Sequence, residues 1–467
     1  METNRKKKEK NLLSGISREL LQPFIDLFHT SKALFGLNLS YVLEGVTYFG
    51  VVGLLAIFFN EYIDLDDIRA GNMVGVLTAG ITLAMLFLGA TVDWIGVRKA
   101  FLAALSFMLV GRILLTISPD IGVPGLWNSA HILAMLGIFG IVIGYGIYQP
   151  AAYAGVKKFT SSRTSAMGYA MLYALMNLGG FLPGLISPPL RRAFQIQGVF
   201  WVYVILTVAG IIVTAFIISK KAEKEAAESA VRDERELGAA GTEEKDETEE
   251  MTGKDKIAYY IKNFPLKDLR FLFFIFILIP VQTLFAHNWL TLPQYTSRAF
   301  EGFVKNNFEF FVNLNPILIF ILTPVVTALT SNRNAYKMMI LGTFIMASPT
   351  FILTLGPSFN SLMAFLILMT IGEAMWQPRF LQWVAEIAPK GMTGIYMGIG
   401  QFPWFLTKVV TSLYSGWFLM KYCPENTPPS HMDTETMWLI YGAIALVSPA
   451  GLFIARKWML KGFRTRA

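Results

Sequence analysis

Residues 271–292 read FLFFIFILIPVQTLFAHNWLTL and contain no Asp, Glu, Lys or Arg. With a rise of about 1.5 Å per residue, a helix of this length reaches ~33 Å, which is enough to cross the hydrocarbon core of a bilayer. A helix on the surface of a soluble protein needs a polar face, and this stretch has none. Residues 33–59 repeat the pattern with a single charge, Glu44. We therefore predict a membrane protein built from spanning α-helices.

The low charge content extends along the whole chain. Of its 467 residues, 54% are hydrophobic and 15% are charged, against about 25% charged residues in soluble domains. The predicted fold class is an all-α polytopic membrane protein with two six-helix bundles. The twelve predicted spans lie at about 33–59, 71–92, 100–118, 130–156, 165–187, 199–219, 270–292, 310–330, 337–356, 360–385, 392–420 and 437–457.

Charged segments flank and divide the two bundles. The N-terminal segment is basic, and its stretch Ser17–Thr30 has apolar residues at helical spacing, which predicts an amphipathic helix lying on the membrane surface. The central segment is rich in Lys and Glu and has too little apolar surface to fold by itself, so we expect a charged linker. The predicted segments are 1–32 (N-terminal segment), 33–219 (first bundle), 220–268 (linker), 269–457 (second bundle) and 458–467 (tail).

The distribution of Lys and Arg predicts the orientation, because both are enriched in cytoplasmic loops. With the N-terminus inside, 31 of the 40 Lys and Arg residues fall in cytoplasmic segments. Both termini, the linker and the tail are therefore predicted to be cytoplasmic, in a multi-pass protein of the plasma (inner) membrane. The net charge of +8 follows this topology and does not indicate nucleic-acid binding. The external loops carry only Arg69, Arg191, Arg192, Arg298, Lys305 and Lys421.

The loop after the second predicted span reads Gly89-Ala-Thr-Val-Asp93-Trp-Ile-Gly96-Val-Arg98-Lys99. Glycines permit a tight turn and close helix approach, and the Asp93 carboxylate can cap a helix or pair with a cation. The loop resembles the G-x-x-x-D-x-x-G-x-[RK]-[RK] signature of the major facilitator superfamily. That resemblance implies two six-helix halves and a cytoplasmic gate at Gly89, Asp93, Gly96, Arg98 and Lys99 that favours the outward-open state.

A narrower resemblance runs from about residue 35 to 420. The chain resembles a divergent member of the proton-dependent oligopeptide transporter family, whose motifs are ExxERFxYYG in span one, G-x-G-x-x-K-P in span four, N-P in span eight and G-E…P in span ten. The corresponding stretches are Tyr41-Val-Leu-Glu44-Gly45-Val-Thr-Tyr48-Phe49-Gly50, Gly144-Tyr-Gly146-Ile-Tyr148-Gln149-Pro150, Asn315-Pro316 and Gly372-Glu373 with Pro378.

The departures from that family concern its charges. Tyr41 stands where the family has its first Glu, Gly45 where it has Arg, and Gln149 where it has Lys. In the family, the Arg and Lys hold the carboxylate of a peptide. The resemblance implies that Glu373 and Asn315 would hold the amino end, and both are present. The site for an amine is therefore expected to remain, while the site for a carboxylate is lost or moved.

Five ionisable residues lie within predicted spans: Glu44, Arg112, Glu373, Arg379 and Lys408. Such residues usually face the bundle interior and have a function. We expect Glu44 to carry the coupled proton, with a structural hydrogen-bonded carboxyl as the alternative. Glu373 and Lys408 have opposite charge and similar depth, which predicts an ion pair that opens during transport or a permanent structural pair. Arg379 is assigned to the cytoplasmic gate in preference to the substrate site.

Three aromatic residues, Tyr48, Tyr148 and Trp404, are expected at the substrate cavity because of their positions relative to Glu44, Gln149 and Lys408, with simple helix packing as the alternative. The predicted substrate-binding residues are Glu373, Asn315, Tyr48, Gln149, Tyr148 and Trp404, and the predicted coupling residues are Glu44, Lys408 and Glu373.

These residues predict a secondary active transporter that moves a small polar solute, peptide-like or amine-bearing, by alternating access with proton coupling. The alternative is a major facilitator exporter or uniporter of a different metabolite or drug, without proton coupling. A membrane-bound enzyme and a ligand-binding receptor on a transporter fold are further alternatives. The sequence contains one cysteine, Cys423, and no phosphate-binding Gly-Lys-Ser/Thr loop. We expect no enzyme activity, cofactor, metal or nucleic-acid partner, and a monomer that interacts with its substrate, protons and the lipid bilayer.

Overall fold

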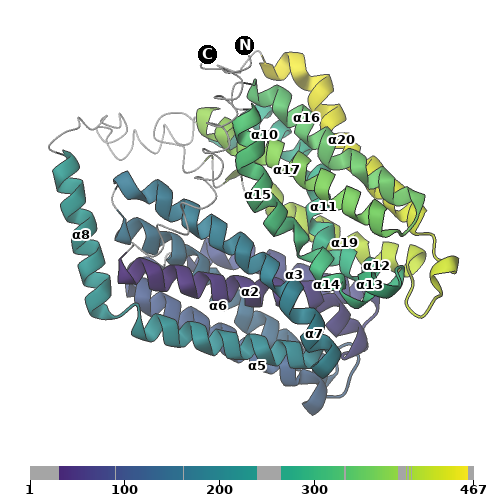
Figure 1. Ribbon diagram of the computed structural model, residues 1–467, viewed down its shortest axis with the longest axis horizontal. Helices are drawn as coiled ribbons and strands as arrows, with labels where there is room; N and C mark the ends of the chain where they lie inside the picture. Colours follow the sequence, from purple (N-terminus) through teal and green to yellow (C-terminus); the bar gives the residue numbers. More distant parts are fainter. Residues whose placement is uncertain are drawn as a thin grey trace, which may run out of the picture. The chain divides into compact units, whose positions relative to one another are not determined.

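The protein is α-helical in all its described elements, apart from short 3₁₀ turns (Figure 1). The computed structural model describes residues 31–89, 91–160, 162–238, 264–330, 333–387, 396, 399–400 and 402–460. The amphipathic helix predicted at Ser17–Thr30, part of the linker and residues 461–467 of the tail lie outside these ranges.

The first half of the chain forms long helices that begin at side-chain caps. Ser31 accepts a hydrogen bond from the backbone N–H of Leu34 at the start of the first helix, and Asp66 accepts one from the N–H of Arg69 at the start of the next. Such caps satisfy N–H groups that have no partner within the helix. The elements are α2 (Lys32–Glu61), α3 (Asp67–Leu88), α4 (Thr91–Ile95), α5 (Val97–Ile121), α6 (Ser129–Phe159), α7 (Ser162–Phe216) and α8 (Lys220–Gly238).

Helix α7 contains two arms. Gln195 has φ 60° and ψ −175°, so the backbone is not helical there. The break lies between the fifth and sixth predicted spans, at 165–187 and 199–219. Two consecutive spans are therefore joined by a sharp change of direction at one residue.

The second half of the chain is more interrupted. Its elements are η1 (Pro265–Lys267), α10 (Leu269–Ile277), α11 (Ile279–Leu290), α12 (Leu292–Arg298), α13 (Gly302–Asn306), α14 (Phe308–Val312), α15 (Leu314–Thr330), α16 (Ala335–Ala347), η2 (Ser348–Leu355), α17 (Phe359–Ile387), α19 (Phe402–Tyr422), η3 (Pro429–His431) and α20 (Thr434–Leu460).

Ten helical stretches in the described residues are long and apolar enough to cross a membrane. One of the ten, Met171–Phe216, includes both arms of α7. Helix α19 is not among the ten, although it covers most of the eleventh predicted span. The all-α, multi-span class is confirmed, and the count of twelve stays a prediction.

The chain divides into two compact units. Unit 1 contains residues 1–241, 288–321 and 412–432, and unit 2 contains residues 242–287, 322–411 and 433–467. In unit 1, α2 packs on α7, and α6 packs on α3 and α5. In unit 2, α16 packs on α17 and α20. Unit 1 thus includes the N-terminal helices together with parts of α11, α15 and α19.

Candidate functional site

A buried ion pair lies within unit 1. Arg112 of α5 donates from Nη1 to Oε2 of Glu44 on α2 at 2.9 Å, and from Nη2 to Oε1 of the same carboxylate. Both side chains are about 98% buried. The Thr47 hydroxyl also donates to Oε2 of Glu44 at 3.0 Å, and Nη1 of Arg112 donates to the hydroxyl of Thr207 on α7. Both carboxylate oxygens are therefore engaged, and three helices are joined.

The cation in this pair comes from a different helix than the family motif would supply. The motif places Arg beside the Glu on span one, where this chain has Gly45. A Cβ at Gly45 would lie 3.2 Å from the Cα of Gly179 on α7, and a Cβ at Gly179 would lie 2.9 Å from the Cα of Gly45. The two backbones approach too closely for an Arg side chain at this position. Arg112 supplies the counter-charge from α5 instead.

Tyr41 and Gln149 also replace charged residues of the motif, and they contact each other. Nε2 of Gln149 on α6 donates to the hydroxyl of Tyr41 on α2 at 2.8 Å, and it lies 3.3 Å from the hydroxyl of Tyr153. A neutral hydrogen bond therefore stands where the family would place two opposite charges. Oε1 of Gln149 is buried and has no hydrogen-bond partner in the described residues, so it offers an acceptor to a ligand.

Tyrosine rings extend this polar region. The rings of Tyr48 and Tyr145 lie 4.7 Å apart between centroids, and those of Tyr41 and Tyr148 stack at 6.1 Å. The hydroxyl of Tyr148 shares a hydrogen bond with that of Ser40 at 3.0 Å. The hydroxyl of Tyr145 is buried without a partner in the described residues. Three of the predicted binding residues, Tyr48, Tyr148 and Gln149, thus belong to one cluster of hydrogen-bonding groups without net charge.

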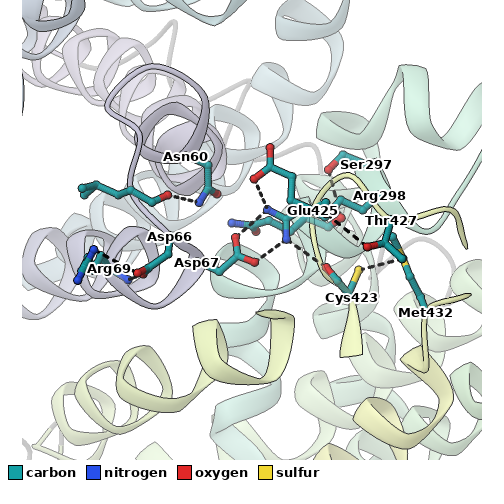
Figure 2. Close-up of polar contacts among 12 residues, drawn as sticks. Asn60, Asp66, Asp67, Arg69, Ser297, Arg298, Cys423, Glu425, Thr427 and Met432 are labelled. Atoms are coloured by element: carbon teal, nitrogen blue, oxygen red, sulfur yellow. Dashed lines mark hydrogen bonds and ion pairs between the residues drawn. The ribbon is translucent and has the colours of Figure 1, made fainter. Parts of the chain in front are cut away.

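A second charged cluster lies at the end of unit 1 where α2 ends and α3 begins, here named the distal end (Figure 2). Arg298 donates to both carboxylate oxygens of Asp67, at 2.6 and 2.7 Å, and to the backbone carbonyl of Cys423 at 3.1 Å. The Glu425 carboxylate lies 3.8 Å from the same guanidinium. Burial lowers the pKa of Arg298, but the hydrogen bonds and charge of Asp67 outweigh it and hold the pKa above its ordinary value. Arg298 therefore stays charged.

Arg191 and Glu309 form another distal ion pair. Nε of Arg191 on α7 donates to one oxygen of Glu309 on α14, and Nη2 donates to the other at 3.2 Å. The guanidinium also lies over the ring of Phe308, 4.7 Å from its centroid. Glu309 is 98% buried. The two distal pairs join α3 to α12 and α7 to α14 within unit 1.

The distal end encloses a polar cavity of about 770 Å³. It is lined by three cationic residues, Arg191, Arg298 and Lys305, and by two acidic residues, Glu61 and Glu425. A cavity with this lining suits hydrated, charged or zwitterionic solutes better than apolar ones.

Small residues let α3 and α19 pack closely beside this cavity. A Cβ on Gly416 would lie 2.3 Å from the backbone oxygen of Asp67, and a Cβ on Gly75 would lie 2.3 Å from Oγ of Ser412. Gly71 and Gly75 form a small-xxx-small pattern, which is typical of close packing between membrane helices. This contact was not predicted from the sequence, although the GxxxG spacing of Gly71 and Gly75 is a signal for it.

The predicted gate loop lies between α3 and α5. Gly96 precedes α5 with φ 82°, a conformation that favours glycine, and Nη2 of Arg98 donates to the carbonyl of Ala215 at 3.2 Å. Gly89 ends α3, and Lys99 is exposed on the first turn of α5. Asp93 lies on α4, and its side chain is outside the described part of the structure.

Unit 2 contains all but one of the predicted substrate-binding, coupling and gate residues that have not yet been described. Glu373 on α17 is buried, and Lys408 on α19 is half-buried; an ion pair between them stays a prediction. The ring of Trp404 stacks on Trp376 with centroids 6.5 Å apart. Nη2 of Arg379 donates to the carbonyl of Thr330 at 2.8 Å.

Asn315 is the exception, since it lies in unit 1, buried near the start of α15. Among the described residues, no group of three or more His, Cys, Asp or Glu side chains could hold a metal ion.

Comparison with known proteins shows the family to which this chain belongs. The sequence profile of the Major Facilitator Superfamily matches residues 37–411, which is most of the chain. The chain belongs to the major facilitator superfamily. It is therefore an integral, multi-pass membrane protein and a secondary transporter, and not an enzyme. The small polar and charged clusters described above are thus parts of a transporter.

Solved structures similar to this transporter share its fold. A peptide transporter POT in complex with sulfate has a TM-score of 0.68 at 18% identity, over 93% of this chain and 96% of that one. A POT family transporter in complex with 5-aminolevulinic acid has a TM-score of 0.67 at 16% identity, over 92% and 97% of the two chains. These neighbours agree with the resemblance found in the sequence.

A curated relative is similar over a shorter region. The drug efflux pump JefA of Mycobacterium tuberculosis is 29% identical over 161 residues, which is 34% of this chain. The matched region spans only 30% of the pump's length.

Proposed function

We propose that the transporter moves a small polar solute, peptide-like or amine-bearing, by alternating access and with proton coupling. The observation that carries this proposal is the buried cluster in unit 1, in which Tyr41, Tyr148 and Gln149 lie near hydroxyl and amide partners. Such groups bind amides and hydroxyls by hydrogen bonds without requiring a charge on the solute. The fold shared with peptide transporters of the POT family supports the substrate class.

The predicted amine site belongs to the same proposal. Glu373 is a buried carboxylate within a spanning helix, where an ionisable residue usually has a function. We assign it to the amino group of the solute, with Asn315 as a hydrogen-bonding partner and Trp404 as an aromatic wall. Because Gln149 replaces the family's Lys, the other end of the solute is expected to be neutral.

Proton coupling is assigned to Glu44, with Lys408 and Glu373 as further coupling residues. Arg112 and Thr47 engage both oxygens of the Glu44 carboxylate, so a proton on Glu44 would remove the negative charge with which the Arg112 guanidinium is paired. Protonation would therefore weaken the link between α2 and α5. This gives a physical route from proton binding to helix movement.

The distal ion pairs are assigned to the external gate. The distal end carries Arg69, Arg191, Arg192, Arg298, Lys305 and Lys421, the few cations that the sequence places outside the cell. Opening this gate requires Arg298 to leave Asp67 and Arg191 to leave Glu309. The loop with Gly89, Asp93, Gly96, Arg98 and Lys99, together with Arg379, is assigned to the cytoplasmic gate.

Thermal unfolding of the purified transporter tests the substrate class. Di- and tripeptides, their amides, simple amines, nucleosides and sugars are each added at two pH values, and a bound ligand at a hundredfold excess over its Kd adds about 2.7 kcal/mol of stability. We expect an amine-bearing compound to raise the Tm of the wild type but not of Glu373→Gln. The control Glu301→Gln removes an exposed carboxylate and should respond like the wild type. A response only to sugars or nucleosides would contradict the proposal.

A second candidate is an exporter or uniporter of another metabolite or drug without proton coupling. It is favoured by the similarity to the efflux pump JefA over 161 residues and by the neutral Tyr41–Gln149 pair. Flux in proteoliposomes distinguishes the two, because a uniporter would not accumulate solute and its flux would not respond to a proton gradient.

A further inference from the structure

An apolar groove of about 580 Å³ lies between α16 and α20, both in unit 2. Its walls include Leu341 and Phe344 on α16 and Ala450 and Phe453 on α20. The Tyr336 hydroxyl donates to the carbonyl of Leu452 at 2.7 Å and ties the two helices together beside the groove. Phe344 and Phe453 are each about half exposed, so the groove is open on its outer side. In a membrane protein this side is available to lipid.

The groove is long enough to cover the depth of one leaflet of a bilayer. Along α20 the lining runs from Leu446 to Leu460, which corresponds to about 21 Å at 1.5 Å per residue. The hydrocarbon core of a bilayer is about 30 Å thick, so one leaflet contributes about 15 Å. A lipid tail that enters at the charged end would therefore find apolar walls over the depth of a leaflet.

Positive charge is concentrated at one end of the groove. Lys337 lies on the first turn of α16, and Arg456 lies near the end of α20. Both side chains are exposed, and neither forms an ion pair with a carboxylate among the described residues. The guanidinium of Arg456 lies 4.2 Å from the ring centroid of Phe453, which holds it over the groove.

The surface beyond Lys337 is more polar. A second cavity of about 650 Å³ includes Lys337 and Leu341 in its lining, together with Thr330, Arg333 and Asn334. An apolar groove and a polar cavity therefore adjoin at Lys337. This arrangement fits an amphiphile whose tail occupies the groove and whose headgroup lies at the cationic end.

We propose that the groove between α16 and α20 binds an anionic glycerophospholipid, with an acyl chain against Phe344 and Phe453 and the phosphate between Lys337 and Arg456. Basic pockets between spanning helices bind anionic lipid headgroups in this manner. Each Lys or Arg near the surface gains about 1 kcal/mol from the net negative charge of anionic lipids. A zwitterionic lipid carries the same phosphate, but its choline balances the charge, so two cations favour the anionic lipid by about thirtyfold. None of the residues that line the groove is among those assigned to substrate and coupling.

Lipid titration followed by native mass spectrometry tests the proposal on the full-length transporter. Phosphatidylglycerol and phosphatidylcholine with identical chains are added to delipidated protein in detergent. We expect phosphatidylglycerol to bind at least tenfold more tightly. Arg456→Gln should reduce this preference several-fold, and Lys337→Gln/Arg456→Gln should abolish it. Lys457→Gln, which removes a neighbouring exposed charge outside the groove lining, should keep it.

A steric pair of variants tests the groove itself. Ala450→Trp fills the groove and should weaken binding of both lipids, whereas Ile454→Trp, on the same helix but outside the lining, should not. Inorganic phosphate alone should produce no thermal shift at concentrations where phosphatidylglycerol does. Equal binding of the two lipids, an unchanged preference in Lys337→Gln/Arg456→Gln, or a dimer that forms without lipid and disappears in Ala450→Trp would each overturn the proposal.

Discussion

Replacing Gly416 by alanine should open the distal end of the transporter. In the structure, a Cβ at Gly416 would lie 2.3 Å from the backbone oxygen of Asp67 and 2.4 Å from the Cα of Ile68. Both atoms belong to the backbone of α3, so no side-chain rotation can relieve the clash. Ordinary contact begins at about 3.4 Å, so α19 must move from α3 by about 1 Å. The same Asp67 accepts the hydrogen bonds of Arg298.

The size of the effect follows from the cost of overpacking. Inserting a methyl group into a well-packed interface typically costs about 1–3 kcal/mol. Because the clash exists only while α3 and α19 are in contact, this cost falls on the distal-closed state alone. The ratio of open to closed transporter should then rise about 5–150-fold.

Alkylation of Cys423 measures this ratio without any added label site. It is the only cysteine of the chain, and its backbone carbonyl accepts a hydrogen bond from Arg298 at 3.1 Å. The thiol is buried, and burial raises its pKa to about 12. At pH 7.5 a pKa near 12 leaves roughly one thiolate in thirty thousand, whereas an ordinary pKa near 8.5 gives about one in ten. Labelling of the native protein therefore proceeds through the open state.

The pH dependence provides an internal check. Labelling through the open state should rise about tenfold per pH unit below about pH 8.5 and level off above it, because the exposed thiol becomes mostly ionised there. Direct attack on the buried thiol would continue to rise toward pH 12. We expect Gly416→Ala to raise the labelling rate at every pH, including the plateau. The pH at which the plateau begins should not change.

Three variants control the experiment. A Cβ at Gly71, on the same face of α3, would lie 3.5 Å from Oγ of Ser415, so Gly71→Ala should label at the wild-type rate. Gly75→Ala should behave like Gly416→Ala, and Gly75→Ala/Ser412→Gly should restore slow labelling, because the clashing side chain is removed. A folded Gly416→Ala protein that labels at the wild-type rate would show that the contact between α3 and α19 does not hold the distal end closed.

Three further predictions concern the buried cluster. Glu44→Gln should destabilise the transporter by about 3–5 kcal/mol, because Arg112 remains buried without its partner. The double variant Glu44→Gln/Arg112→Gln should lose less stability. Equal losses of stability in thermal unfolding would contradict an ion pair between Glu44 and Arg112. Tyr41→Glu/Gln149→Lys places opposite charges where the neutral hydrogen bond lies, and should favour peptides with free carboxylates over their amides by about tenfold. If a binding titration showed no change in the preference between carboxylates and amides, Tyr41 and Gln149 would not contact the carboxyl end of the peptide. Gly45→Arg should lower the Tm, because a Cβ at this position already lies 3.2 Å from the Cα of Gly179 and the longer side chain must separate α2 from α7. An unchanged Tm would show the contact to be dispensable.

The sequence was sufficient to predict the helical fold because hydrophobic length alone distinguishes spanning helices. Runs such as 271–292 have no polar face in any register. The break in α7 was predicted only as a gap between two spans, because a single residue with positive φ, Gln195, leaves no compositional signal. Composition also fails to identify α19 as a span. It is absent from the ten stretches that are long and apolar enough, because Lys408 and several hydroxyl side chains lower its hydropathy.

The candidate site was predictable in its residues but not in its pairings. Glu44 and Arg112 were both recognisable as charges within spans, yet 68 positions separate them, and sequence gives no helix contact of that range. The pairing of Tyr41 with Gln149 likewise depends on how α2 and α6 meet. The distal pairs of Asp67 with Arg298 and Arg191 with Glu309 were missed, because charges at loop positions resemble ordinary solvated residues until the fold buries them.

Uptake by proteoliposomes tests whether this major facilitator transporter couples protons to a small amine-bearing solute. Vesicles with an imposed inward proton gradient and an interior-negative potential are given a radiolabelled ligand identified by the thermal screen. We expect accumulation above the external concentration, its collapse when a protonophore is added, and loss of accumulation but not of downhill exchange in Glu44→Gln/Arg112→Gln. Equilibration without accumulation, at a rate that ignores the proton gradient in the wild type, would contradict proton coupling.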